Sequence, residues 1–283
     1  MTIANDFFKA LEAESPLQIA GTINAYCALL AKHAGFKCLY LSGAGVANAS
    51  FGLADLGLTH LDDVVDDARR ITSVCDLPLL VDIDTGFSHE STSKDLCEKM
   101  IDAGVAAIQI EDQQLNKRCG HRDGKKLVSS QEMQKRLQSL KSAVRHNELL
   151  IMARTDAYDV EGLDSTIQRC IDYQSCGVDM IFAESIRTLE DYKAITDNLT
   201  VPVLANITEF GKTPMFTVDE LRSAGIRMVL YPLSAFRAMN KSALDVYRNI
   251  KLHGTQSSVL QNMQTRDELY KILNYYKHED NQN

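Results

Sequence analysis

The residues with the greatest chemical potential are five neighbours in the middle of the chain: Lys117, Arg118, Cys119, Gly120 and His121. A thiol beside cationic groups ionises more easily, because the cations stabilise the thiolate. Glycine allows the backbone to approach a ligand closely. This combination suits a site that binds a polyanion and transfers a proton through the sulfur of Cys119. The alternative is a basic surface loop that carries a buried cysteine.

A second group of polar residues lies at the ends of short apolar runs that are typical of buried strands. Its members are Ser42, Asp82, Asp84, Glu111, Asp112, Arg154, Asp156, Glu184 and Asn206. One polar residue in such a place would only end a strand, but six successive runs end in this way. In barrel enzymes the active site lies at the carboxyl-terminal ends of the strands. We therefore expect these side chains to surround one site.

Asp82 and Asp84 form an Asp-x-Asp motif at the end of one of these runs. Alternate residues of a strand point to the same side, so both carboxylates are expected to face the site. Two like charges held close together favour a divalent cation, and oxygen ligands suit Mg2+ or Mn2+. Glu111 is a further candidate acid. The alternative is that the motif only ends the strand.

Arg154 is a candidate for binding a substrate carboxylate through two parallel hydrogen bonds. The alternative is a salt bridge to Asp156 or to an acid of a neighbouring strand.

Strand-like runs alternate with helical patterns along the chain. The expected strands are residues 18–22, 37–42, 78–84, 106–112, 149–156, 179–184, 201–207 and 227–232. Helices are expected at 61–74, 91–103, 129–145 and 163–175, and glycines that suit helix ends stand before strands at Gly35, Gly104, Gly177 and Gly225. Eight such units predict an α/β fold of the (β/α)8 TIM-barrel type, with a doubly wound open sheet as the alternative.

The last part of the chain extends beyond the eight strand and helix units. A long helix is expected from Ser234 to about Leu252 and a second one at 266–276, after a break at Gly254. We interpret residues 1–283 as a single barrel domain with 254–283 as a helical extension. The apolar face of the second helix must pack on its own barrel or on a neighbouring subunit.

Bulk composition limits the class of protein. The chain has 283 residues and a net charge of −8, which argues against a general nucleic-acid binder. Its N-terminus carries acids and lacks a long apolar core, and no run of about 18 apolar residues occurs, so we expect neither a secretory signal nor a membrane span. The seven cysteines lack the pairing of a disulfide framework or zinc site, which is typical of a cytoplasmic protein.

Several motifs occur in the order found in a known group of enzymes. They are LYLSGAG, PLLVDIDTGF, IQIEDQ, KRCGH, IMARTDA, IFAES, LANITEFG and LYPLSAFRAMN. They resemble the isocitrate lyase/phosphoenolpyruvate mutase superfamily, most closely the 2-methylisocitrate lyases, and the match runs from about residue 16 to about residue 276. The resemblance implies cleavage of (2S,3R)-2-methylisocitrate to pyruvate and succinate in the methylcitrate cycle of propionate catabolism. It also implies a barrel fold, Mg2+, and a homotetramer in which C-terminal helices swap between subunits.

The resemblance also implies roles for particular residues. Cys119 corresponds to the general acid, His121 lies in its loop, and Tyr40 is a candidate for handling the proton of the substrate hydroxyl. Metal binding falls to Asp82 and Asp84, and Phe182, Leu230 and Pro232 match positions that leave room for the extra methyl group. Substrate binding is implied for Ser42, Gly43, Ala44, Cys119, Gly120, Arg154, Glu184, Asn206, Ile207, Thr208, Arg237 and Arg266.

Several residues depart from the pattern of the resembling family, namely Ala44, Ser88, Ala183 and the pair Tyr26 and Cys27. Ala44 stands where glycine is common, which would be unfavourable by about 1 kcal/mol only at a positive φ. The alternatives are cleavage of isocitrate to glyoxylate and succinate, an activity on oxaloacetate or a phosphonate, and a barrel that has lost activity and only binds partners.

Overall fold

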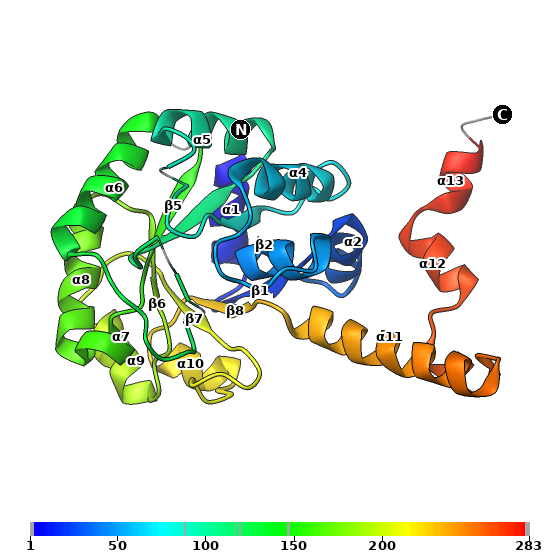
Figure 1. Cartoon of the computed structure of the whole chain (residues 1–283). Helices are drawn as coiled ribbons and strands as arrows, with labels where there is room; N and C mark the ends of the chain where they lie inside the picture. Colours follow the sequence, from blue (N-terminus) through cyan, green and yellow to red (C-terminus); the bar gives the residue numbers. More distant parts are fainter. Residues whose placement is uncertain (1–2, 88, 116, 119, 146–147, 281–283) are drawn as a thin grey trace.

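The computed structural model describes residues 3–280 except 88, 116, 119 and 146–147. Eight parallel strands follow one another in chain order and close into a barrel, which confirms the predicted (β/α)8 fold and excludes the open sheet (Figure 1). The strands are β1 Leu17–Gly21, β2 Cys38–Leu41, β3 Leu79–Asp82, β4 Ala107–Glu111, β5 Leu150–Thr155, β6 Met180–Ala183, β7 Val203–Asn206 and β8 Met228–Tyr231. All eight predicted strands are found; β1 is shifted by one residue and the other seven are slightly shorter than expected.

The alternation of side chains along each strand divides the core into two clusters. In β2, Leu39 and Leu41 point outward and join the larger cluster between the barrel and its helices. Cys38 and Tyr40 point inward and join the second cluster, which fills the barrel. Helix α1, Ile3–Ala13, was not predicted from the sequence. Its buried residues, including Phe7, belong to the inner cluster, so α1 covers one end of the barrel.

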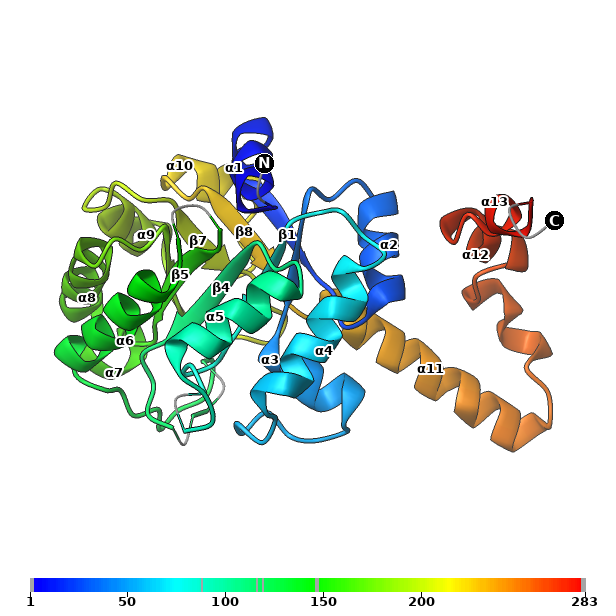
Figure 2. The ribbon, with the colours of Figure 1, turned by 90° about the horizontal axis from the view of Figure 1, so that it is seen from above.

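The helices surround the barrel on its outside (Figure 2). They are α2 Ala25–His33, α4 Leu61–Thr72, α5 Ser93–Asp102, α6 Ser130–Ala143, α7 Tyr158–Glu161, α8 Leu163–Ser175, α9 Leu189–Thr196 and α10 Val218–Ser223, with short turns α3 Gly43–Gly45 and η1 Val46–Ser50 after β2. The four glycines expected at helix ends all have positive φ, between 74° and 96°. Glycine is favoured there because it has no Cβ to clash in the left-handed region.

The C-terminal segment leaves the barrel as an arm (Figure 1). It contains α11 Ser234–His253, η2 Ser257–Asn262, α12 Arg266–Ile272 and α13 Tyr275–Asp280. The single helix expected at 266–276 is therefore interrupted, because Asn274 adopts a left-handed φ of 51°. None of the described residues of α11, η2 or α12 is buried, although many are large and apolar. Among the described residues, no helix is long and apolar enough to cross a membrane.

Candidate active site

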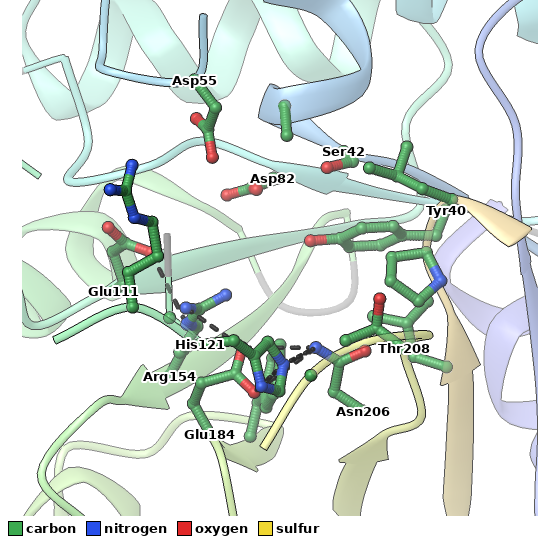
Figure 3. Close-up of a pocket in the computed structure, with 18 of the residues that line it drawn as sticks. Tyr40, Ser42, Asp55, Asp82, Glu111, His121, Arg154, Glu184, Asn206 and Thr208 are labelled. Carbon is green, nitrogen blue, oxygen red and sulfur yellow. Dashed lines mark hydrogen bonds and ion pairs between the residues drawn. The ribbon is translucent and has the colours of Figure 1, made fainter. Parts of the chain in front are cut away.

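A cavity of about 240 Å³ lies at the carboxyl-terminal mouth of the barrel (Figure 3). Side chains from the ends of several strands point into it, as the sequence pattern predicts. Its lining includes Tyr40, Ser42, Ala44, Asp55, Asp82, Glu111, Lys117, Arg118, Gly120, His121, Arg122, Arg154, Phe182, Glu184, Asn206, Thr208, Glu209, Phe210, Gly211, Leu230, Pro232, Leu233 and Arg237. The basic loop, defined here as residues 117–121, thus meets the polar strand ends at one cavity.

The guanidinium of Arg154 is the central cation of this cavity and is almost fully buried. Its Nε and Nη2 donate to Asp156 at 2.9 and 3.1 Å, and Nη2 also lies 3.1 Å from Glu184 Oε2. Glu111 approaches Nε at 3.5 Å. The ring of Phe182 packs against the guanidinium carbon at 4.9 Å. The salt bridge to Asp156 foreseen as the alternative exists, and it orients Arg154 toward the cavity rather than removing it from there.

Glu184 is held as a carboxylate although it is buried. Burial alone would raise its pKa, but the charge of Arg154 and the hydrogen bond with His121 lower the pKa to about 2. The backbone N–H of Lys212 donates to His121 Nδ1 at 3.0 Å. A neutral His121 therefore carries its proton on Nε2, which lies 3.2 Å from Glu184 Oε1 and donates to it.

Gly120 lies against the same two side chains. A Cβ built on Gly120 would stand 2.3 Å from Arg154 Nη2 and 2.6 Å from Glu184 Cγ. No side chain can be accommodated at that distance, so a glycine is required for the basic loop to reach the bottom of the cavity.

Asp82 and Asp84 lie close together, but not through strand alternation as expected. Strand β3 ends at Asp82, and Asp84 takes a left-handed φ of 50° beyond it. Asp84 forms an ion pair with the buried ammonium of Lys117, which lies 2.8 Å from Asp55 as well. Burial raises the pKa of Asp84 to about 7, opposed by the charge of Lys117. The charge of Lys117 is thus already balanced by carboxylates before any substrate arrives.

The carboxylates beside Lys117 fit a divalent cation. Burial raises the pKa of Glu111 well above its ordinary value, and its Oε1 has no hydrogen-bond partner among the described residues. Asp82 and Asp84 present hard oxygen donors nearby. No three His, Cys, Asp or Glu side chains among the described residues are grouped closely enough to hold an ion by themselves. This pattern suits Mg2+, which uses one or two carboxylates and keeps several waters.

Tyr40 is connected to the carboxylate cluster by a residue that the sequence interpretation missed. Its hydroxyl donates to Gln109 Oε1 at 2.8 Å, and Gln109 Nε2 donates to Asp82 Oδ1 at 3.3 Å. Burial and the charge of Asp82 raise the pKa of Tyr40 well above its ordinary value, so the phenol stays protonated. The structure buries the amide of Gln109 completely. In the sequence, the only sign of its role is a polar amide residue in the middle of an apolar run.

The loop after β2 agrees only in part with the roles implied by resemblance. Ser42 and Ala44 line the cavity. The N–H of Gly43 instead donates to Asp82 Oδ2 at 3.2 Å, so this amide is already used within the protein. Ala44 lies in α3 and is not among the residues with positive φ, so replacing glycine there causes no left-handed strain.

The remaining predicted binding residues fall into three groups. Asn206, Thr208 and Arg237 line the cavity, with Asn206 Nδ2 donating to both oxygens of Glu184 at 3.4 and 3.3 Å. Ile207 instead packs in the outer core. Arg266 begins the exposed helix α12 and does not line the cavity of its own chain. Cys119 and Ser88 lie outside the described residues.

Asp55 also lines the cavity and was not identified from the sequence. It stands in a loop without a recognisable pattern, and only its contact with Lys117 at 2.8 Å reveals its position.

Comparisons with known proteins agree with this geometry. The model of the family named phosphoenolpyruvate phosphomutase matches residues 8–251. The 2-methylisocitrate lyase of Escherichia coli (strain K12) is 54% identical over 275 residues, which cover 97% of this chain and 93% of that protein. The 2-methylisocitrate lyase of Bacillus subtilis (strain 168) is 43% identical over 277 residues, covering 98% and 91%.

Among solved structures, 2,3-dimethylmalate lyase matches with a TM-score of 0.89 at 29% identity, covering 100% of this chain and 95% of that one. Fold and site therefore define an enzyme of the phosphoenolpyruvate mutase/isocitrate lyase superfamily. Within this superfamily, the chain belongs to the 2-methylisocitrate lyase family, as its identity to the curated relatives shows.

The low pKa of Glu184 generates a prediction about stability and pH. A carboxylate with a folded-state pKa of about 2 stabilises the fold fully above its unfolded pKa, about 4.3. This stabilisation is lost as the pH falls from there toward 2. Glu184→Gln should lower the free energy of unfolding at pH 7 by about 1–3 kcal/mol, because Arg154 loses one of its charged partners. Urea unfolding of both proteins should show this difference constant from pH 7 to 5 and narrowing below about pH 4.3.

The matched control is Glu190→Gln, which changes an exposed carboxylate in the first turn of α9. It should leave the unfolding curve nearly unchanged. A Glu184→Gln difference that stays the same down to pH 3 would contradict the assigned charge state.

Proposed function

We propose that this chain is a carbon–carbon lyase that cleaves (2S,3R)-2-methylisocitrate to pyruvate and succinate. The observation that carries the proposal is the meeting of the basic loop, the Asp82 carboxylate and the Arg154 guanidinium around one cavity. The identity to 2-methylisocitrate lyases over nearly the whole chain supports it.

The charges of the cavity suit a substrate with three carboxylates. Arg154 uses Nε and Nη2 for protein carboxylates, and no partner of its Nη1 is found among the described residues, which leaves Nη1 available for a substrate carboxylate. Arg237 is half-exposed at the rim and is paired only loosely with Glu209, at 3.7 Å. Thr208 and Ser42 add hydroxyl groups to the lining. Phe182, Leu230 and Pro232 supply the apolar part of the wall against which the substrate methyl group would pack.

The reaction requires two proton movements. The C2 hydroxyl of the substrate loses its proton as the C2–C3 bond breaks, and its oxygen becomes the ketone of pyruvate. The bonding electron pair stays on C3, so the leaving group is succinate deprotonated next to a carboxylate. We assign the proton delivered to this carbon to the thiol of Cys119, which the basic loop carries. Tyr40 is a protonated phenol that donates to Gln109, so its oxygen can orient the substrate hydroxyl by accepting a hydrogen bond from it, without taking the proton. The hydroxyl proton passes to water in the cavity, and the thiolate left on Cys119 regains a proton from water, so the reaction neither consumes nor releases a net proton.

A bound Mg2+ would supply Lewis-acid polarisation of the substrate hydroxyl and the adjacent carboxylate. Asp82 and Asp84 are the residues proposed to hold it, with Mn2+ as an alternative ion, and the unpartnered Glu111 Oε1 lies in the same cluster. Cations of the cavity, Arg154 above all, stabilise the negative charge that develops on the leaving succinate.

The proposed activity predicts a substrate preference, and a rate of cleavage that depends on the thiol of Cys119. With Mg2+, purified protein should form pyruvate from 2-methylisocitrate much faster than glyoxylate from isocitrate. Cys119→Ser should reduce kcat by about 100-fold or more, because the hydroxyl is a far weaker acid than the thiol. Separate quantification of pyruvate and glyoxylate measures both effects.

Cys176→Ser is the matched control, since this thiol is partly exposed at the end of α8 and does not line the cavity. Dominant glyoxylate formation would instead indicate a short isocitrate lyase. Failure to cleave either acid would turn attention to oxaloacetate and phosphonate substrates.

A second prediction concerns the metal. Removal of divalent ions with EDTA should abolish activity, and Mg2+ should restore it. Asp84→Asn should weaken Mg2+ binding at least about tenfold, because it removes one carboxylate charge from the cluster. Titration calorimetry, or electron paramagnetic resonance with Mn2+ as the probe, measures this binding without relying on activity. Asp76→Asn, which alters an exposed carboxylate paired with Lys32, should bind the ion like the wild type.

We further propose that the chain forms a homotetramer in which the C-terminal arm packs on a neighbouring copy. Exposed apolar side chains on the arm include Leu244, Tyr247, Ile250, Leu252 and Leu260. An apolar cavity of about 460 Å³ lies where α11 leaves the barrel and is lined by residues such as Leu30 and Phe36. A second copy can cover both surfaces at once. Arg266 would then approach an active site only from a neighbouring subunit.

Light scattering after size-exclusion chromatography should therefore give four times the mass of one chain. The double variant Tyr247→Glu, Leu252→Glu should dissociate the assembly, because each change places a charge on an apolar surface that the partner covers. Val160→Glu changes an exposed apolar residue on α7, away from the arm, and should remain tetrameric (Figure 1). A wild-type monomer would refute the proposed assembly.

A further inference from the structure

Lys125 is a buried cation that neither the sequence interpretation nor the proposed chemistry uses. Its side chain is 1% exposed, which is rare for a lysine. The ammonium donates to the carbonyl oxygen of Gly120 and lies 3.3 Å from Asp156 Oδ1 and 3.2 Å from Asp159 Oδ2. The ammonium thus has three partners, one in the basic loop and two acids in the segment that follows β5.

The carbonyl of Gly120 receives a second donor from within the protein. Ser185 Oγ, directly after Glu184, donates to it at 2.9 Å. Two hydrogen bonds thus hold one backbone carbonyl of the basic loop, while the missing Cβ allows the same residue to rest against Arg154 and Glu184. Gly120 is therefore held at its carbonyl and lies against the two cavity side chains at its Cα.

The partners of Lys125 connect the loop to the substrate-binding cation. Asp156, which forms an ion pair with Lys125, also accepts two hydrogen bonds from Arg154. Asp159 forms ion pairs with Arg187 Nη2 at 2.6 Å and with Lys212 Nζ at 2.8 Å. The backbone of Lys212 in turn donates to His121, at the other end of the loop. One connected set of charges therefore holds the loop at two adjacent residues, Gly120 and His121.

Stability alone does not explain a lysine at this place. A buried ion pair contributes little net stability, because desolvation of the charges offsets their attraction. Asp156 keeps Arg154 and Asp159 keeps Arg187 and Lys212 when Lys125 is absent, so neither acid depends on Lys125 for charge balance. Of the three partners, only the Gly120 carbonyl would be left without any charged donor, with the hydroxyl of Ser185 as its remaining partner.

We propose that Lys125, assisted by Ser185, is a positioning residue that holds the basic loop against Arg154 and Glu184 and so places the loop for proton transfer. The activity readout rests on the proposed lyase function, whereas the placement of the loop is measured independently of it. Lys125 touches no reacting atom in this scheme and acts through the Gly120 carbonyl.

The test is Lys125→Met, which keeps the length and apolar stem of the side chain and removes its charge. We expect kcat to fall about 100-fold, since a loop displaced by about 1 Å loses near-attack geometry. KM should change much less, because Arg154 keeps its contacts with Asp156 and Glu184. An arginine-specific protease should cut after the exposed Arg118 and Arg122 at least about tenfold faster than in the wild type, because the loop opens locally more often.

Lys126→Met is the matched control, because its side chain is exposed and adjacent. It should keep wild-type kcat and wild-type protease resistance. Unchanged kcat in Lys125→Met, or lost kcat with unchanged protease resistance, would overturn the proposal. If Lys125→Met fails to fold, Ser185→Ala decides: faster cleavage after Arg118 and Arg122 supports the proposal, and wild-type cleavage refutes it. A wild-type protein without lyase activity would refute the proposed function and leave the protease comparison valid.

Discussion

The active site depends on one buried guanidinium, that of Arg154, which is held between acids from three adjacent strands. Glu111 ends β4, Asp156 follows β5 and Glu184 follows β6. A cation in the barrel mouth is stable only if carboxylates balance its charge, and a buried carboxylate stays ionised only beside such a cation. Arg154 and the carboxylate of Glu184 therefore make each other's burial possible, and the low pKa of Glu184 is the consequence. At Glu111 burial outweighs the charge of Arg154, and the pKa is raised.

This mutual dependence explains why a cavity suited to a trianion contains so many acids. Arg154 and Lys117 are both neutralised by protein carboxylates, so the free cavity has no large excess of positive charge. The sequence indicates that the basic loop binds a polyanion, and the structure shows that Lys117 of this loop is already paired with Asp55 and Asp84. The carboxylates orient the cations and leave selected donors open, such as Arg154 Nη1. Affinity for an anion then comes from oriented donors, as in other preorganised sites.

The sequence predicted the barrel well because the barrel depends on local and periodic signals. Each of these signals depends only on neighbouring residues: apolar runs indicate strands, helical patterns indicate helices, and glycines such as Gly104 and Gly177 indicate helix ends. The regular alternation of strands and helices then predicts a parallel sheet. The polar ends of the strands were predicted for the same reason, since a strand end is a local feature. Arg154, Glu184 and Asn206 all reach the cavity as that pattern implies.

The features that the sequence interpretation missed depend on contacts between distant segments. Asp84 reaches its place through a left-handed turn, and Gln109 links Tyr40 to Asp82 across 69 and 27 positions of sequence. Lys125 lies five residues from Gly120, but its role depends on Asp156 and Asp159, which only the closed barrel brings to the loop. The loop that carries the chemistry is thus placed by groups outside its own motif. A motif can identify the reacting residue, but the position of that residue is determined by the strands against which the loop packs.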